Sequence, residues 1–136
     1  MKYSLILLSL SLTIHVFGQQ GNSFTNKAEA ENKTDANGLK EGKWIEYFGE
    51  ENDLVVKTDK QHALGYTLTT YKAGNVCGAQ QFYMDGKLMT EIIHKEKGQA
   101  LYKSYYPNGK LMSETTYTNG VAGATKNYDE NGNEIK

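Results

Sequence analysis

Arginine is absent from this chain of 136 residues, so lysine carries all of its positive side-chain charge at neutral pH. The 15 basic side chains are balanced by 16 acidic ones, and the formal net charge is −1. Proteins that bind nucleic acid need a basic surface that neutralises phosphates. Arginine is also the usual residue for bidentate recognition of a phosphate group. The composition therefore argues against a nucleic-acid partner and against phosphate-specific recognition.

Cysteine and proline each occur once, as Cys77 and Pro107. A single cysteine excludes an internal disulfide. No neighbour in the sequence would lower the pKa of the thiol, so we interpret Cys77 as a small residue within a strand, with a reactive thiol or an interchain disulfide as the alternatives. Pro107 lies beside an expected turn, where its missing N–H does least harm to a sheet.

Long hydrophobic runs are also absent, apart from a short one near the start of the sequence. Lys2 precedes an apolar stretch over residues 5–16, and small or β-branched residues occupy the −3 and −1 positions of a cleavage before Gln19. The stretch is shorter than the roughly 20 apolar residues that span a bilayer. We therefore predict a signal peptide over residues 1–18, with a membrane anchor as the alternative. The mature protein is then expected in the periplasm, at the cell surface or outside the cell, with no integral membrane segment.

The next segment, residues 19–37, is polar except for Phe24. Such a segment buries too little apolar surface to offset its ordering entropy, so we predict a flexible linker. Residues 38–136 have the size of one domain.

Within that domain, related segments recur at a spacing of 23 residues. The spacing joins Gly86, Gly109 and Gly132, which end similar turn sequences, and also Tyr71, His94 and Tyr117. A period of this length indicates a stack of small repeated units. The function of such a stack lies on its surface or at a place where the repeat is interrupted, and not in a central pocket. The units that we predict are residues 38–71, 72–94, 95–117 and 118–136.

Each unit has the pattern of a β-hairpin. Asp85-Gly86, Asn108-Gly109 and Asn131-Gly132 are typical of two-residue type I′ turns, and aromatic and β-branched residues flank them. The predicted strand pairs are residues 80–83 with 88–94, 101–106 with 111–117, and 125–128 with 134–135. The predicted fold is all-β: an array of antiparallel β-hairpins that forms a single twisted sheet. A small barrel or sandwich is the alternative.

The first unit departs from the pattern, because residues 49–64 replace the tight turn between strands at 42–47 and 66–71. This long loop is either a tolerated surface insertion, with or without a short strand of its own, or a specificity loop. Its acidic residues lack the glycine and the closing glutamate of a calcium-binding loop, so we predict no metal site there.

Residues 38–48 read Gly-Leu-Lys-Glu-Gly-Lys-Trp-Ile-Glu-Tyr-Phe, and Tyr-x-x-Gly and Asn-Gly-Lys-Leu segments follow. Residues 36–136 thereby resemble the MORN repeat variant family, in the form found in exported bacterial proteins. The resemblance implies a MORN-type sheet of β-hairpins and a role in protein scaffolding. Many members of the family carry antitoxin names.

No catalytic constellation is recognisable in the sequence. Glu91 and His94 would point to opposite faces of one strand, which excludes shared metal ligation. Ser104 and Ser113 lie within expected strands without a nucleophile motif. We therefore predict a protein that is not an enzyme and that uses no cofactor and no metal.

Two functions remain as hypotheses. The first is an exported, envelope-associated binding module that holds a protein, or alternatively a glycan, on exposed aromatic residues and the long loop. The candidate interaction surface consists of Trp44, Tyr47, Asp53, Leu54, Tyr83, Tyr105, Tyr106 and Tyr128. Intramolecular stacking is the other interpretation of these aromatic residues. The second hypothesis is an antitoxin-like or immunity-type partner, which pairs its open strand edges with another protein.

Overall fold

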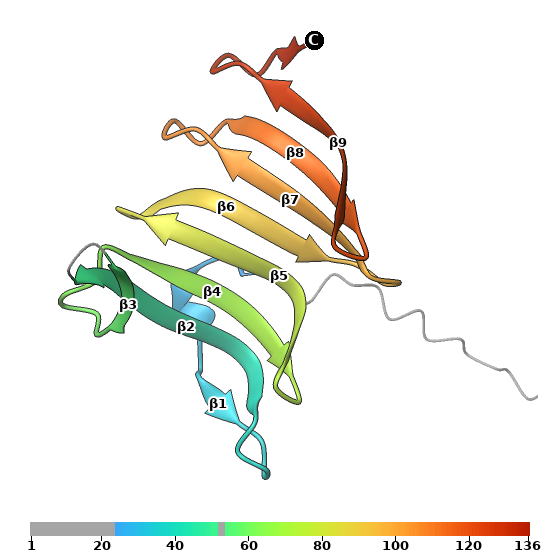
Figure 1. Cartoon of the computed structure of the whole chain (residues 1–136). Coiled ribbons are helices and arrows are strands. Elements are labelled where there is room, and N and C mark those ends of the chain that lie inside the picture. The colour runs from blue at the N-terminus through green and yellow to red at the C-terminus, as the bar shows by residue number, and fades with distance from the viewer. Residues whose placement is uncertain (1–23, 52–53) are drawn as a thin grey trace, which may run out of the picture.

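The computed structural model describes residues 24–51 and 54–136, and ten strands in this part of the chain form one antiparallel sheet. The sheet is open and twisted, and it neither closes into a barrel nor folds into a sandwich (Figure 1). Neighbouring strands in the sheet follow the chain order except that β3 pairs with β2 beside the main path. The strands are β1 (Lys33–Thr34), β2 (Lys40–Glu51), β3 (Leu54–Thr58), β4 (Gly65–Lys72), β5 (Asn75–Met84), β6 (Lys87–His94), β7 (Gln99–Tyr105), β8 (Leu111–Thr118), β9 (Val121–Tyr128) and β10 (Glu134–Ile135). The predicted all-β sheet of hairpins is confirmed.

The three predicted type I′ turns lie where expected, but only one of them has that geometry. Asp85 and Gly86 both have positive φ, at 49° and 73°, between the paired residues Met84 and Lys87. In the next hairpin only Gly109 has positive φ, and the Tyr106 N–H donates across a longer loop to the Lys110 carbonyl, 2.8 Å away.

The reason for the longer loop lies in the one or two residues before each Asn-Gly pair. Pro107 favours the second position of a type I turn, so glycine alone takes the left-handed conformation after it. In the last hairpin the Asp129 carboxylate accepts from the N–H groups of Asn131 and Asn133, at 2.9 and 2.8 Å, and holds the same kind of loop. The type I′ prediction is therefore wrong for Asn108-Gly109 and Asn131-Gly132.

Strand alternation and register divide the side chains between two faces. The pairs Tyr47 with Tyr66 and Tyr66 with Tyr83 define one face, which we call the tyrosine face and which also carries Tyr105 and Tyr128. The opposite face carries Trp44, Thr69, Gln80, Ile92, Tyr102, Thr115 and Thr125, and we call it the threonine face.

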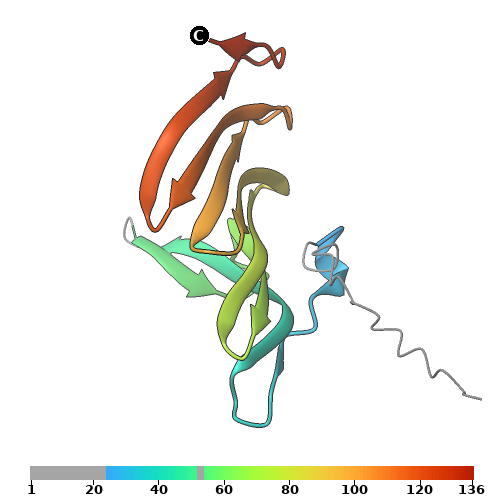
Figure 2. The ribbon, with the colours of Figure 1, turned by 90° about the vertical axis from the view of Figure 1, so that its right-hand side faces the viewer.

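An N-terminal segment lies on the tyrosine face beside the first strands, where Figure 2 shows it in blue on one side of the sheet. Phe24 is only 7% exposed, and its ring lies 5.2 Å from the Lys43 ammonium. A short 3-10 helix, Lys27–Glu29, follows, and Glu29 forms an ion pair with Lys43. The segment is thus attached to the sheet.

Residues 24–37 therefore differ from the flexible linker predicted for residues 19–37. Burial of Phe24 and pairing of β1 with β2 supply the contacts that a composition-based prediction omits. The turn before β2 also repeats the last loop of the chain, because Asp35 accepts from the N–H groups of Asn37 and Leu39 at 2.8 and 2.9 Å. The predicted signal peptide, residues 1–18, lies outside the described residues.

The outer edge of β2 is covered along most of its length. β1 pairs with Lys40 and Glu41 at one end, and β3 pairs with residues 47–51 at the other. Between them, the Asn32 side chain accepts from the Ile45 N–H at 2.7 Å and donates to the Ile45 carbonyl at 3.0 Å. The long first loop thus contains a short strand of its own, β3, which helps to cap the sheet.

Candidate binding site

The tyrosines of the tyrosine face form a row across the sheet, held by ring contacts and by carboxylates. Tyr66 stacks on Tyr83 with ring centroids 4.8 Å apart, and Tyr47 meets Tyr66 edge-on at 6.1 Å. Farther along, the hydroxyl of Tyr105 donates to Glu91 at 3.2 Å. Burial, together with the Glu91 charge, raises the pKa of Tyr105 to about 12. This hydroxyl therefore remains a proton donor at neutral pH.

A second row of side chains runs beside the tyrosines and changes character along the sheet. Its register order is Ile45, Leu68, Gln81, Glu91, Lys103, Glu114 and Lys126. The row begins with two aliphatic residues, of which Leu68 is 1% exposed, and ends with carboxylates and ammonium groups in alternation. The first half can therefore bury a covering segment, whereas the second half is stable in contact with water.

The two halves of the tyrosine face are covered to different extents. Residues 24–29 lie over the first strands, as the contacts of Phe24, Lys27 and Glu29 show. The second half carries a shallow hollow of about 260 Å³, here called the C-terminal hollow. It is lined by Lys95, Leu101, Glu114, Thr116, Ala124 and Lys126.

Another hollow, of about 240 Å³, lies where the N-terminal segment, the long first loop and the β5–β6 turn meet. We call it the loop hollow. Its lining consists of Lys27, Tyr47, Lys60, Ala63, Leu64, Gly65, Tyr66, Asp85 and Gly86. Since these residues come from four separate parts of the chain, the hollow exists only in the folded protein.

Gly65 fixes the point at which the first loop enters the sheet. A Cβ atom at this position would lie 2.3 Å from the Tyr83 carbonyl oxygen and 2.5 Å from the Phe48 ring. Two backbone hydrogen bonds hold the preceding residue, Leu64. Its N–H donates to the Phe48 carbonyl at 3.0 Å, and its carbonyl accepts from the Asp85 N–H at 3.3 Å. Only glycine permits the backbone at position 65 to lie so close to Tyr83 and Phe48. This close packing positions residues 63–66, which line the loop hollow.

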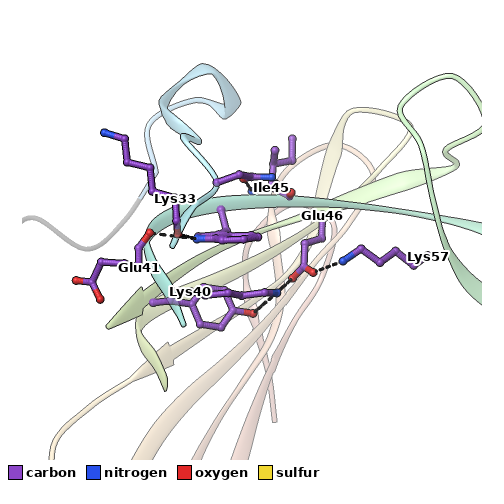
Figure 3. A network of polar contacts seen from close by, with 9 residues as sticks. Lys33, Lys40, Glu41, Ile45, Glu46 and Lys57 are labelled. Atoms are coloured by element: carbon purple, nitrogen blue, oxygen red, sulfur yellow. Dashed lines mark hydrogen bonds and ion pairs between the residues drawn. The ribbon is translucent and has the colours of Figure 1, made fainter. Parts of the chain in front are cut away.

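Trp44 lies on the threonine face and is engaged within the molecule. Its indole N–H donates to the carbonyls of Lys33, at 2.9 Å, and Glu41, at 3.1 Å. The Lys40 ammonium lies 4.8 Å from the centre of the Trp44 ring. It forms an ion pair of 2.7 Å with Glu46, which Figure 3 shows together with the contact between Glu46 and Lys57. Trp44 therefore fastens β1 to β2.

The structure distributes the predicted interaction residues over several places. Tyr47, Tyr83, Tyr105 and Tyr128 share the tyrosine face, whereas Trp44 lies on the other face. The Tyr106 hydroxyl donates to the Tyr128 carbonyl at 2.9 Å. Leu54 is 65% exposed on β3, and Asp53 lies outside the described residues.

Lys27 and Tyr66 line the loop hollow but do not belong to the predicted interaction surface, and Lys60 belongs to it only as part of the long first loop. Lys27 belongs to the segment predicted as a linker, and the only signal against that prediction is Phe24, a large apolar residue in a polar stretch. Tyr66 could have been found from strand alternation, because it precedes Leu68 by two positions and must share its face.

Residues 24–51 and 54–136 contain neither a cation-binding cluster nor a membrane-spanning helix. No group of three or more His, Cys, Asp and Glu side chains there is arranged to hold a metal ion. In the same part of the chain, no helix has the length and apolarity needed to cross a membrane.

Comparison with known proteins gives one match. Residues 99–119, which comprise β7, its loop and β8, match the family model described as MORN repeat variant. Neither a curated protein nor a solved structure was found to be similar to the chain.

Proposed function

Because residues 99–119 form a MORN repeat variant, we propose that the chain is an exported, non-catalytic binding module that holds a protein partner on its tyrosine face. A MORN repeat suggests a repeat binding module, and such modules are generally non-catalytic. The N-terminal hydrophobic stretch, residues 5–16, supports export and an association with the cell envelope.

The row of tyrosines on a partly uncovered face is the observation that carries this proposal. Tyr83, Tyr105 and Tyr128 continue past the part of the face that residues 24–29 cover. Tyrosine combines a large apolar ring with a polar hydroxyl, and it is enriched in the centres of protein interfaces. The adjoining C-terminal hollow offers room for a side chain of the partner.

Capture of envelope proteins tests the proposal when it is combined with matched variants. We expect Tyr105→Ala to reduce capture of the partner at least tenfold, because it removes the middle ring of the uncovered part of the row. Tyr102→Ala is the matched control, since Tyr102 lies on the same strand but on the threonine face, where it is 38% exposed. Equal capture by both variants, with folding verified by circular dichroism, would contradict the proposal, and so would capture of polysaccharide in place of protein.

An antitoxin-like or immunity-type partner is the second candidate function, and the exposure of β3 favours it. This strand pairs only with β2 in the described part of the chain, and its side chains Leu54 and Val55 are 65% and 78% exposed. An exposed apolar edge strand can add to the sheet of another protein. Val55→Lys should then abolish binding of a partner that pairs with β3. It should leave intact the capture of any protein that binds to the tyrosine face through Tyr105. If Val55→Lys binds like the unmodified protein, this candidate is eliminated.

A further inference from the structure

We propose that the loop hollow binds a carboxylate side chain of the partner protein, between the ammonium groups of Lys27 and Lys60 and against the rings of Tyr47 and Tyr66. This inference rests on the protein partner of the proposed function and identifies the chemistry that the partner presents. It also gives the long first loop a role, because Lys60, Ala63 and Leu64 form one side of the hollow.

Charge is the first argument for a carboxylate. No ion pair among the described residues involves Lys27 or Lys60, whereas Lys126 of the C-terminal hollow lies 3.8 Å from Glu114. Asp85 is the only acidic residue in the lining of the loop hollow, so its lining has a net charge of +1. Incoming carboxylate oxygens would accept charge-assisted hydrogen bonds from the ammonium groups, while an incoming ammonium group would be repelled.

The tyrosine walls are the second argument. The Tyr66 ring stacks on the Tyr83 ring. The Lys27 ammonium lies over the Tyr66 ring, 5.3 Å from its centroid. In the described part of the chain, no hydrogen bond engages the hydroxyls of Tyr47 and Tyr66. Both tyrosines line the hollow together with Lys27 and Lys60, and their hydroxyl groups can donate to an acceptor-only group such as a carboxylate.

Size and position suit a side chain of a partner that covers the tyrosine row. A volume of about 240 Å³ admits one acidic side chain and excludes a folded segment. The hollow also lies at the end of the tyrosine row, because Tyr47 and Tyr66 belong to both. A partner that covers the row can thus place one acidic side chain in the loop hollow.

Nuclear magnetic resonance titration with two short peptides tests the inference. The probes are acetyl-Ala-Glu-Ala-amide and its neutral match acetyl-Ala-Gln-Ala-amide. We expect the glutamate peptide to shift the backbone amides of residues 64–66 and 85–86, with a dissociation constant on the order of 1 mM, as suits a single side chain. The glutamine peptide should bind at least tenfold more weakly.

Lysine variants complete the experiment. Lys27→Gln and Lys60→Gln should each weaken binding of the glutamate peptide about fivefold, whereas Lys72→Gln, an exposed lysine at the other end of β4, should not change it. Equal binding of the two peptides, or unchanged binding after both Lys27→Gln and Lys60→Gln, would overturn the inference. Tighter binding of glucuronate than of the glutamate peptide would overturn the assignment to a protein. Tyr105→Ala separates the two proposals, because it impairs partner capture without changing peptide binding at the loop hollow.

Discussion

The two ends of the sheet are built from related strands, but other segments cover the strands at one end and leave those at the other end exposed. At the first end, β2 is flanked by β1, Asn32 and β3, and its tyrosine face is covered by Phe24 and the 3-10 helix. At the other end, β9 is exposed over most of its length, and in the described part of the chain β10 pairs with only Tyr128 and Asn127. Every segment that covers the first end falls outside the repeat.

This difference shows that the repeat supplies a sheet but little core. A single sheet of hairpins leaves both faces in contact with solvent, and the fully buried large side chain in the described residues is Leu68, at the covered end. Repeat proteins commonly need atypical terminal segments that cap exposed surfaces. We interpret residues 24–37, Trp44 and the first loop as such a cap.

The first prediction tests whether the core is concentrated at the covered end. Leu68→Ala should lower the free energy of unfolding by about 3 kcal/mol, because it opens a cavity beneath the cap. Leu101→Ala, in the lining of the C-terminal hollow, should cost about 1 kcal/mol, because water already reaches its side chain. Urea denaturation measures both. Equal losses would show that the two ends contribute alike and would remove the basis of the comparison.

The second prediction concerns the anchor of the cap. Phe24→Ala should lower the free energy of unfolding by about 2 kcal/mol, less than a central phenylalanine, because the rest of the segment still contacts β2. Urea denaturation gives the loss, with Leu54→Ala as the control for an exposed apolar residue, expected within about 0.5 kcal/mol of the unmodified protein. A loss for Phe24→Ala no larger than that of the control would mean that the segment adds nothing to stability.

The third prediction concerns the hydrogen bonds at the edge of β2. Asn32→Ala removes the two hydrogen bonds to Ile45 and should cost about 1 kcal/mol. Faster hydrogen exchange at the Ile45 amide would locate the effect. Asn127→Ala on β9 is the control and should cost less than about 0.5 kcal/mol. Unchanged exchange at Ile45 would show that Asn32 does not cap the edge.

The fourth and smallest effect is a pH dependence of the cap at the covered end. Hydrogen bonds from Lys43 and Thr25 lower the pKa of Glu29 from its ordinary value to about 2. Because the pKa is lowered in the folded state, this contribution to stability is present above pH about 4.5 and is lost as the pH falls through about 2. We expect the cap to loosen in that range before the sheet unfolds.

Fluorescence of Trp44, the only tryptophan, follows this loosening because its indole is hydrogen-bonded to β1. Glu29→Gln should reduce the pH dependence between pH 4.5 and 2, and the part that remains belongs to Glu46, whose pKa is also lowered, against the effect of burial, by hydrogen bonds from Lys40 and Lys57. If the fluorescence of Glu29→Gln and of the unmodified protein changes alike with pH, the ion pair with Lys43 does not hold the cap.

Much of the fold could be predicted because its signals are local. The dipeptides at residues 85–86, 108–109 and 131–132 mark hairpin loops, and the spacing of 23 residues marks the units. Turn type was harder to predict, because it depends on Pro107 and Asp129, which precede the dipeptides. Trp44 belongs to the predicted interaction surface, and the structure shows that it fastens β1 to β2.

The candidate site was less predictable. Alternation places Tyr47, Tyr83, Tyr105 and Tyr128 on one face, and the register in the structure brings them into a row with Tyr66. The loop hollow has no local signal, because Lys27 and Lys60 are unremarkable lysines in polar segments.

The sequence by itself determined the period, the hairpins and the all-β sheet, because turn chemistry and alternation act over a few neighbouring residues. The tertiary structure alone decided which end is covered and where the loop hollow lies. Those features depend on contacts between distant residues, such as Lys27 with Tyr66 and Glu29 with Lys43. Such contacts leave no pattern in a sequence whose repeat describes only strands and the turns between them.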